Sequence, residues 1–94
     1  MNGEKIKRIE YSTKYFRSFK KLPREIRERA REKEAYFKKD PFDPRLKSHK
    51  LGGKFQEYWG YSVDYKYRVI FRLLNGGGAL FFDIGLHPIY EKGE

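Results

Sequence analysis

Apolar and polar positions follow two different periods along the chain. Between residues 12 and 39 the apolar residues recur every three or four positions, which is typical of helices with one buried face. From residue 55 to residue 86 they alternate with polar or small residues, which is typical of strands that bury one face. The sequence therefore predicts a helical region followed by a sheet, joined by a basic connector at residues 45–53.

Two helices are expected in the first half. The hydroxyl of Ser12 can cap the first helix, and Pro23 can open the second because its missing N–H is not needed in the first turn. The second helix should run to about Lys39 and end at the two prolines of residues 40–44. The apolar positions that define the buried faces of the two helices are Tyr15, Phe16, Phe19, Leu22, Ile26, Ala30 and Phe37.

Four strands complete the expected fold. A short strand precedes the helices at residues 6–11, and a hairpin of residues 55–63 and 67–74 follows them, with a turn at 64–66. The glycine-rich run at 75–78 predicts a second hairpin turn that leads into a last strand. The expected order is β-α-α-β-β-β, an α+β fold in which a helical hairpin packs on one face of a small, mainly antiparallel sheet. One domain spans residues 1–94.

Strand parity predicts which side chains face the helices. Tyr67, Val69 and Phe71 share one face, so Arg68 should point from the opposite, helix-free face toward solvent or a ligand. An ion pair of this arginine with Asp83 or Glu57 is the structural alternative. In the last strand the same reasoning places Leu80, Phe82, Ile84 and Leu86 on the helix side, and Phe81, Asp83 and Gly85 on the helix-free side.

The charge distribution points to a polyanionic partner. The net charge of +9 lies entirely in residues 1–50, which hold 17 Lys and Arg against 8 Asp and Glu. A field of this sign attracts nucleic acid, although a solvated helix surface would carry the same charges. Because the chain has no cysteine, a disulfide scaffold and a thiolate zinc site are excluded. Without a signal peptide or a long apolar run, we expect a soluble cytoplasmic protein that does not enter membranes.

Three residue types suited to RNA cleavage are expected around one concave surface: His49 in the connector, Arg68 in the hairpin, and His87 and Tyr90 after the last strand. Cleavage through the 2′-hydroxyl needs a base, a fixed cation at the phosphate and an acid for the leaving 5′-oxygen. Each residue also has a plainer interpretation, as a solvated loop residue, a turn partner or an aromatic at the core edge. Two histidines so far apart, with no further ligand, predict neither a metal site nor a cofactor.

The segments DPFDPRLKSHKLGGKFQEYWGYSVDYKYRVIF and LFFDIGLHPIY resemble the RelE/ParE superfamily of bacterial and archaeal toxins, nearest its YafQ-like branch. The resemblance implies a metal-independent endoribonuclease that cleaves mRNA on the ribosome and is restrained by a cognate antitoxin. By position, Arg68 matches the arginine that contacts the scissile phosphate. His49 and His87 match histidines of the family, the latter credited with proton transfer, and Tyr90 matches an aromatic that orients the nucleotide.

The chain departs from this pattern on the first hairpin strand. Gly60 and Ser62 stand where relatives carry basic residues, so RNA contacts would have to come from elsewhere. The expected RNA-binding residues are Lys47, Lys50, Lys54, Tyr58 and Lys66. Two alternatives therefore stay open: a ParE-like toxin that inhibits DNA gyrase without cutting RNA, and a degenerate member that only binds an antitoxin.

Overall fold

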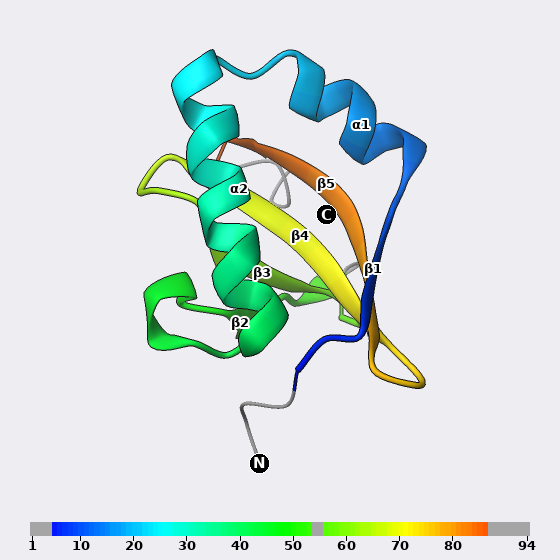
Figure 1. Cartoon of the computed structure of the whole chain (residues 1–94). Coiled ribbons are helices and arrows are strands. Elements are labelled where there is room, and N and C mark those ends of the chain that lie inside the picture. Colours follow the sequence, from blue (N-terminus) through cyan, green and yellow to red (C-terminus); the bar gives the residue numbers. More distant parts are fainter. Residues whose placement is uncertain (1–4, 54–55, 87–94) are drawn as a thin grey trace.

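The computed structural model of the chain describes residues 5–53 and 56–86. Its described residues form two helices, a short 3-10 helix and a five-stranded sheet of order β1-β5-β4-β3-β2 (Figure 1). The elements are β1 (Arg8–Tyr11), α1 (Thr13–Lys20), α2 (Arg24–Lys39), η1 (Pro44–Leu46), β2 (His49–Lys50), β3 (Trp59–Ser62), β4 (Tyr67–Leu74) and β5 (Gly78–Leu86).

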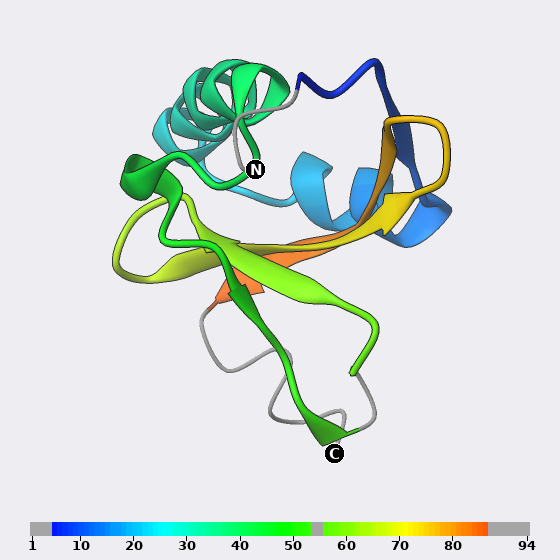
Figure 2. The same cartoon turned by 90° about the horizontal axis from the view of Figure 1, so that it is seen from below.

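The sheet is mixed, because β1 runs parallel to β5 while the other neighbouring strands are antiparallel. Both helices cover the same face, so that the molecule has two layers (Figure 2). The expected α+β fold, with a helical hairpin on one face of a mainly antiparallel sheet, is confirmed. Neither described helix is long and apolar enough to cross a bilayer.

The helix boundaries follow the local signals in the sequence. The Ser12 hydroxyl accepts a hydrogen bond from the backbone N–H of Tyr15 at 2.9 Å and donates to the Phe82 carbonyl at 2.6 Å. The cap of α1 is thereby tied to β5. Helix α2 begins directly after Pro23 and ends at Lys39, as expected.

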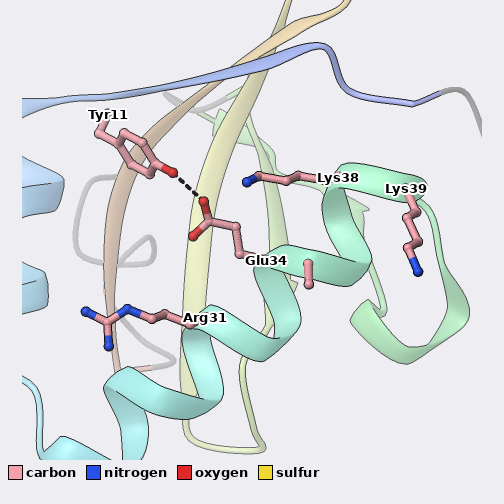
Figure 3. Close-up of a pocket in the computed structure, with 6 residues that line it drawn as sticks. Tyr11, Arg31, Glu34, Lys38 and Lys39 are labelled. Atoms are coloured by element: carbon pink, nitrogen blue, oxygen red, sulfur yellow. Dashed lines mark hydrogen bonds between the residues drawn. The ribbon is translucent and has the colours of Figure 1, made fainter.

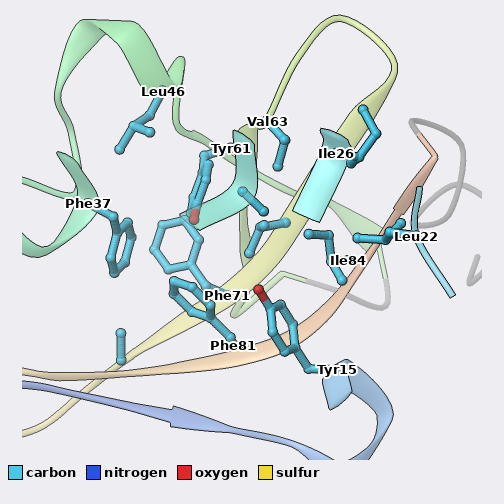
Figure 4. Close-up of a cluster of buried hydrophobic side chains, with 13 residues drawn as sticks. Tyr15, Leu22, Ile26, Phe37, Leu46, Tyr61, Val63, Phe71, Phe81 and Ile84 are labelled. Carbon is cyan, nitrogen blue, oxygen red and sulfur yellow. The ribbon is translucent and has the colours of Figure 1, made fainter. Parts of the chain in front are cut away.

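The core lies between the helices and the sheet and is dominated by aromatic rings (Figure 4). Phe37 from α2 lies edge-on to Phe71 and Phe81, with ring centroids 4.8 and 5.1 Å away. Phe16 is an exception among the positions expected to be buried: it is 55% exposed and lies beside the Tyr11 ring at 5.6 Å. Helix α1 is therefore held by Tyr15, with Leu22 buried just after its end, while the Phe16 ring on it faces solvent.

A β-bulge overturns part of the face assignment in β5. Ile70 pairs with Asp83 and Phe71 pairs with Phe81, so that Phe82 is an extra residue between two successive pairs. As a result Phe81, expected on the helix-free side, is buried in the core, whereas Ile84 beyond the bulge lies in the core as expected. The prediction was wrong for Phe81 because uninterrupted alternation cannot anticipate an inserted residue.

The prediction was also wrong for Leu80 and Phe82, expected on the helix side: Leu80 is opposite Arg72, and Phe82 packs on Tyr58 on the helix-free face. Asp83, expected on the helix-free side, accepts a hydrogen bond from Ser18 of α1.

The connector at residues 45–53 holds more structure than expected. It contains η1 and then β2, which pairs with β3 and forms an edge of the sheet. Strand β3 begins at Trp59, and Phe55, expected to start it, lies outside the described residues. Two residues are too few for alternation to reveal a strand, so β2 became visible only through its pairing.

Candidate functional site

Arg68 lies on the helix-free face of the sheet, as its parity in β4 predicts. Its neighbours Val69 and Phe71 are buried under the helices. Arg68 itself is half-buried and is opposite Ser62 on β3 and Gly85 on β5. Because both flanking residues are small, neither covers the guanidinium from the adjacent strand.

The Arg68 guanidinium is held by backbone carbonyls rather than by an acid. Its Nη1 donates to the carbonyl of Asp64 at 2.6 Å and to that of Tyr67 at 3.2 Å. The ion pairs considered as alternatives do not form, since Asp83 accepts from Ser18 on α1 and Glu57 lies 3.6 Å from Arg72. Neutral carbonyls orient the arginine without compensating its charge, which suits a group that must meet a phosphate.

His49 shares this face, because it is opposite Gly60, and Gly60 has the same parity as Ser62. A side chain at Gly60 would begin 3.6 Å from Cε1 and 3.7 Å from Nε2 of the imidazole, so the glycine provides the space in which the ring lies. Strand spacing and register place the Cα atoms of His49 and Arg68 roughly 12 Å apart. The two side chains can therefore approach a common ligand from neighbouring positions.

One contact of the imidazole favours a particular tautomer. Nδ1 of His49 lies 3.1 Å from the carbonyl oxygen of Lys47, which can only accept, so this contact fits a proton on Nδ1. In that tautomer the lone pair is on Nε2, the nitrogen nearer to Gly60. An imidazole held in this way is suited to accept a proton at Nε2.

From the sequence, Gly60 was noted only as a position where relatives carry a basic residue. Its contribution to the site is to make room for His49, and Leu51 also packs there, 3.4 Å from the position that a Cβ would take. The role of Gly60 depends on its pairing with His49, which exists only because β2 forms. Since two residues are too few to predict β2, the sequence does not show that His49 and Gly60 lie side by side.

The predicted RNA-binding lysines are not gathered on one surface. Lys47 ends η1 in a left-handed conformation and is exposed, and Lys66 lies in the β3–β4 turn beside the ring of Tyr65. Lys50 is opposite Trp59, and its Nζ lies 5.8 Å from that indole, so it belongs to the helix side and not to the face of His49. Lys54 lies outside the described residues.

Tyr58 packs on the helix-free face rather than projecting freely from it. Its ring centroid lies 5.2 Å from that of Phe82, and the Arg72 guanidinium lies 6.0 Å from the tyrosine ring. Arg72 has the same parity as Arg68 and is a second cation on this face that the sequence analysis did not consider. The sequence could have predicted this, because a residue four positions after Arg68 in the same strand has its side chain on the same face.

The other predicted site residues, His87 and Tyr90, lie outside the described residues. The described part of the chain contains no group of three or more His, Asp and Glu side chains that could hold a metal ion. Within that part, the candidate site consists of Arg68 and His49 on the helix-free face, with Lys47 and Lys66 near its ends.

No family model and no curated protein sequence matches the chain. Several solved structures, however, have a similar fold. The chain aligns with YafQ from E. coli strain BL21(DE3) at a TM-score of 0.73 and 17% identity, over 87% of this chain and 94% of that one. It also aligns with a chain of the toxin–antitoxin complex RelBE2 from Mycobacterium tuberculosis at a TM-score of 0.77 and 15% identity, over 93% and 98% of the two chains.

A third match is the archaeal RelE–RelB complex from Pyrococcus horikoshii OT3, at a TM-score of 0.72 and 15% identity, over 89% of this chain and 98% of that one. The likeness extends over nearly the whole length of each of these chains. The RelE-like fold implied by the sequence resemblance is thereby confirmed.

Proposed function

We propose that this chain is the toxin of a type II toxin–antitoxin system and acts as a metal-independent endoribonuclease that cleaves mRNA on the ribosome. The observation that carries the proposal is the position of Arg68, between two small residues on the helix-free face and on the same face as His49. A fixed cation beside an imidazole with an accepting nitrogen supplies two of the three groups that cleavage through the 2′-hydroxyl requires.

In the proposed reaction, Nε2 of His49 takes the proton of the 2′-hydroxyl as its oxygen attacks the adjacent phosphorus. Arg68 stabilises the negative charge that develops on the phosphate oxygens. As the bond from phosphorus to the 5′-oxygen breaks, His87 gives that oxygen a proton, and a 2′,3′-cyclic phosphate is left on the upstream fragment. Tyr90 orients the nucleotide. No step in this scheme needs a metal ion.

A cognate antitoxin is the proposed protein partner. Among the structural neighbours, YafQ was crystallised with DinJ, RelE with RelB, and YoeB with YefM. For this chain we infer a partner of the same class, together with mRNA and the ribosome as the RNA targets in the cytoplasm. The net charge of +9 supports both an RNA target and an acidic protein partner.

Induced expression in a bacterial host, followed by mapping of mRNA 5′ ends, tests the proposal. The wild-type chain should arrest growth and produce new ends within translated messages, and Arg68→Ala or His87→Ala should relieve both effects. Arg72→Ala is the matched control, since it removes the same side chain from the same face of β4. Full toxicity of both site variants with an intact fold would refute the assignment.

A ParE-like toxin is the second candidate, favoured by one observation. The helix-free face carries Gly60 and Ser62 at two of the positions next to the site, so it has fewer cations than an RNA-cleaving surface would be expected to have. A supercoiling assay with purified gyrase distinguishes the two activities. Inhibited supercoiling together with intact messages would replace the nuclease assignment with this one.

A further inference from the structure

The turn between β3 and β4 is closed by one carboxylate. Oδ1 of Asp64 accepts hydrogen bonds from the backbone N–H groups of Lys66 and Tyr67, each at 2.8 Å. An Asp oxygen bonded to the main chain two residues later forms an Asx turn, which fixes the backbone locally. The backbone N–H groups of Val63 and Asp64 also donate to the carbonyl of Tyr67, at 2.9 and 3.4 Å. The main chain of residues 63–67 is therefore held at both of its ends.

The same turn holds the guanidinium of Arg68. Asp64 follows Ser62, the residue opposite Arg68, by two positions. The backbone carbonyl of Asp64 accepts from Nη1 of the arginine at 2.6 Å, and the carbonyl of Tyr67 accepts from the same nitrogen at 3.2 Å. Both carbonyls belong to the closed turn. Their directions therefore depend on the hydrogen bonds that the Asp64 side chain makes.

Both bonds use one nitrogen of Arg68, and this leaves an edge of the guanidinium for a ligand. Within the described part of the chain, Nε and Nη2 donate to no protein group. These two nitrogens form a planar pair of donors that matches two oxygens of a phosphate. Because Nη1 is anchored, the pair faces one direction. A cation held in this way needs little reorganisation when negative charge develops on the phosphate.

Glu34 is a second carboxylate that joins two segments of the chain. It lies in a groove of about 570 Å³ between β1 and α2, and an adjoining hollow of about 280 Å³ runs along α1 beside Phe16. Glu34 accepts a hydrogen bond from the Tyr11 hydroxyl, which links α2 to β1 (Figure 3). This contact is on the helix side of the sheet, whereas Arg68 lies on the other side. The sheet therefore separates Glu34 from the proposed cleavage site, which makes it a comparison for Asp64.

We propose that Asp64 is a positioning residue for Arg68 in the proposed cleavage reaction. Its carboxylate closes the turn, and the turn directs the carbonyl that holds Nη1. In this role the side chain acts as a hydrogen-bond acceptor, and its negative charge is not required. The inference rests on the proposed function, because that function supplies the phosphate that Arg68 meets.

Two substitutions of Asp64 test the inference, with kcat and KM measured separately for cleavage of a ribosome-bound message by the full chain. Asp64→Ala should lower kcat by about tenfold and change KM by less than about twofold, because the guanidinium loses its alignment but not its charge. Asp64→Asn should cleave at nearly the wild-type rate, since the amide oxygen can accept from the same backbone N–H groups.

Glu34→Ala is the matched control. It removes a hydrogen-bonded carboxylate from the helix side of the sheet and should leave kcat unchanged. Thermal unfolding of each variant establishes that it is folded at the assay temperature. A fall in kcat that Asp64→Ala shows and Glu34→Ala does not is therefore specific to the turn.

NMR of the ¹⁵N-labelled chain adds a readout that does not depend on activity. In the wild type, the two terminal nitrogens of the Arg68 guanidinium should give separate signals, because the carbonyls slow the rotation of Nη1. Asp64→Ala should merge these signals, and Asp64→Asn should keep them apart. The Arg68→Lys variant identifies the signals by their absence.

The other outcomes overturn the inference, and the variants distinguish its failure from that of the proposed function. An unchanged kcat in Asp64→Ala would refute the role of Asp64 and leave the proposed function standing. An equal loss in Asp64→Asn would do the same, since the charge would then act in place of the turn. Merged signals in the wild type would show that the carbonyls do not hold the guanidinium. If the wild type cleaves no message, the proposed function fails before any variant is compared, and the inference fails with it.

Discussion

The two faces of the sheet differ in what their side chains do, although the same strands supply both. On the helix side, Phe37, Tyr61, Phe71 and Phe81 are fully buried against one another. On the other side, the buried apolar side chains among the described residues are Leu51 and Ile70, while Arg68 and Arg72 lie four positions apart along β4 and are only partly buried.

This difference shows how a chain of 94 residues can combine a stable core with an exposed site. Because successive side chains of a strand point to opposite faces, β4 contributes Val69 and Phe71 to the core and Arg68 to the site. Stability and activity should therefore respond to different substitutions within one strand.

The largest effect on stability should come from the helix side. Phe71→Ala should lower the free energy of unfolding by about 3–5 kcal/mol, because it leaves a cavity in an aromatic core that cannot collapse around it. Urea denaturation measures the loss. Phe16→Ala, which truncates a mostly exposed ring, is the control and should cost less than about 1 kcal/mol. Similar losses in the two variants would show that the core is not where the structure places it.

On the other face, Arg68→Lys should lower activity and leave stability nearly unchanged. The lysine keeps the charge but loses the planar fork, so RNA cleavage should slow by about 100-fold while the free energy of unfolding changes by less than about 1 kcal/mol. Cleavage of a ribosome-bound message and thermal unfolding of the same sample measure both quantities. An equal loss of stability and activity would mean that the arginine serves the turn at Asp64 rather than the reaction.

Tyr61→Phe should raise stability, by about 1 kcal/mol, since the Tyr61 hydroxyl is buried with no hydrogen-bond partner among the described residues. Burial also raises the pKa of this hydroxyl well above its usual value. The unfolded chain therefore ionises this tyrosine before the folded protein does, so the folded state keeps its stability below the usual tyrosine pKa and loses stability as the pH rises beyond it.

Thermal unfolding across alkaline pH measures both expectations for this residue. The phenylalanine variant should unfold at a higher temperature and lose less stability at high pH. Tyr65→Phe, at a position that is 80% exposed, should change neither quantity. A less stable Tyr61→Phe variant would indicate that the hydroxyl is hydrogen-bonded in solution.

The smallest effect should lie in the turn before His49. Hydrogen bonds from Arg45 lower the pKa of the Asp43 carboxyl from 3.8 to about 2. The interaction is present above the ordinary pKa and is lost as the pH falls toward 2. In the Asp43→Asn variant the unfolding midpoint should therefore depend less on pH in the acid range than it does in the wild type. Asp40→Asn serves as a neighbouring control. Identical acid profiles for Asp43→Asn and the wild type would contradict this expectation.

Much of the fold could be predicted from local patterns. The Ser12 cap, the start of α2 after Pro23 and its end at Lys39, and the bounds of β4 all agree with the sequence-based expectation. The outward direction of Arg68 was also correct, because it depends only on parity within one uninterrupted strand. Three features were missed: the strand at His49, the bulge at Phe82 and the helix-side position of Lys50.

By itself, the sequence determined where helices form and which face of β4 is buried, since these properties depend on residues a few positions apart. Only the tertiary structure decided that His49 lies over Gly60, that Phe81 replaces its neighbours in the core, and that Phe16 lines a groove beside α2. The physical reason is that strand pairing, register and helix packing depend on contacts between segments far apart in the sequence. The periodicity within one segment carries no information on the free energies of those contacts.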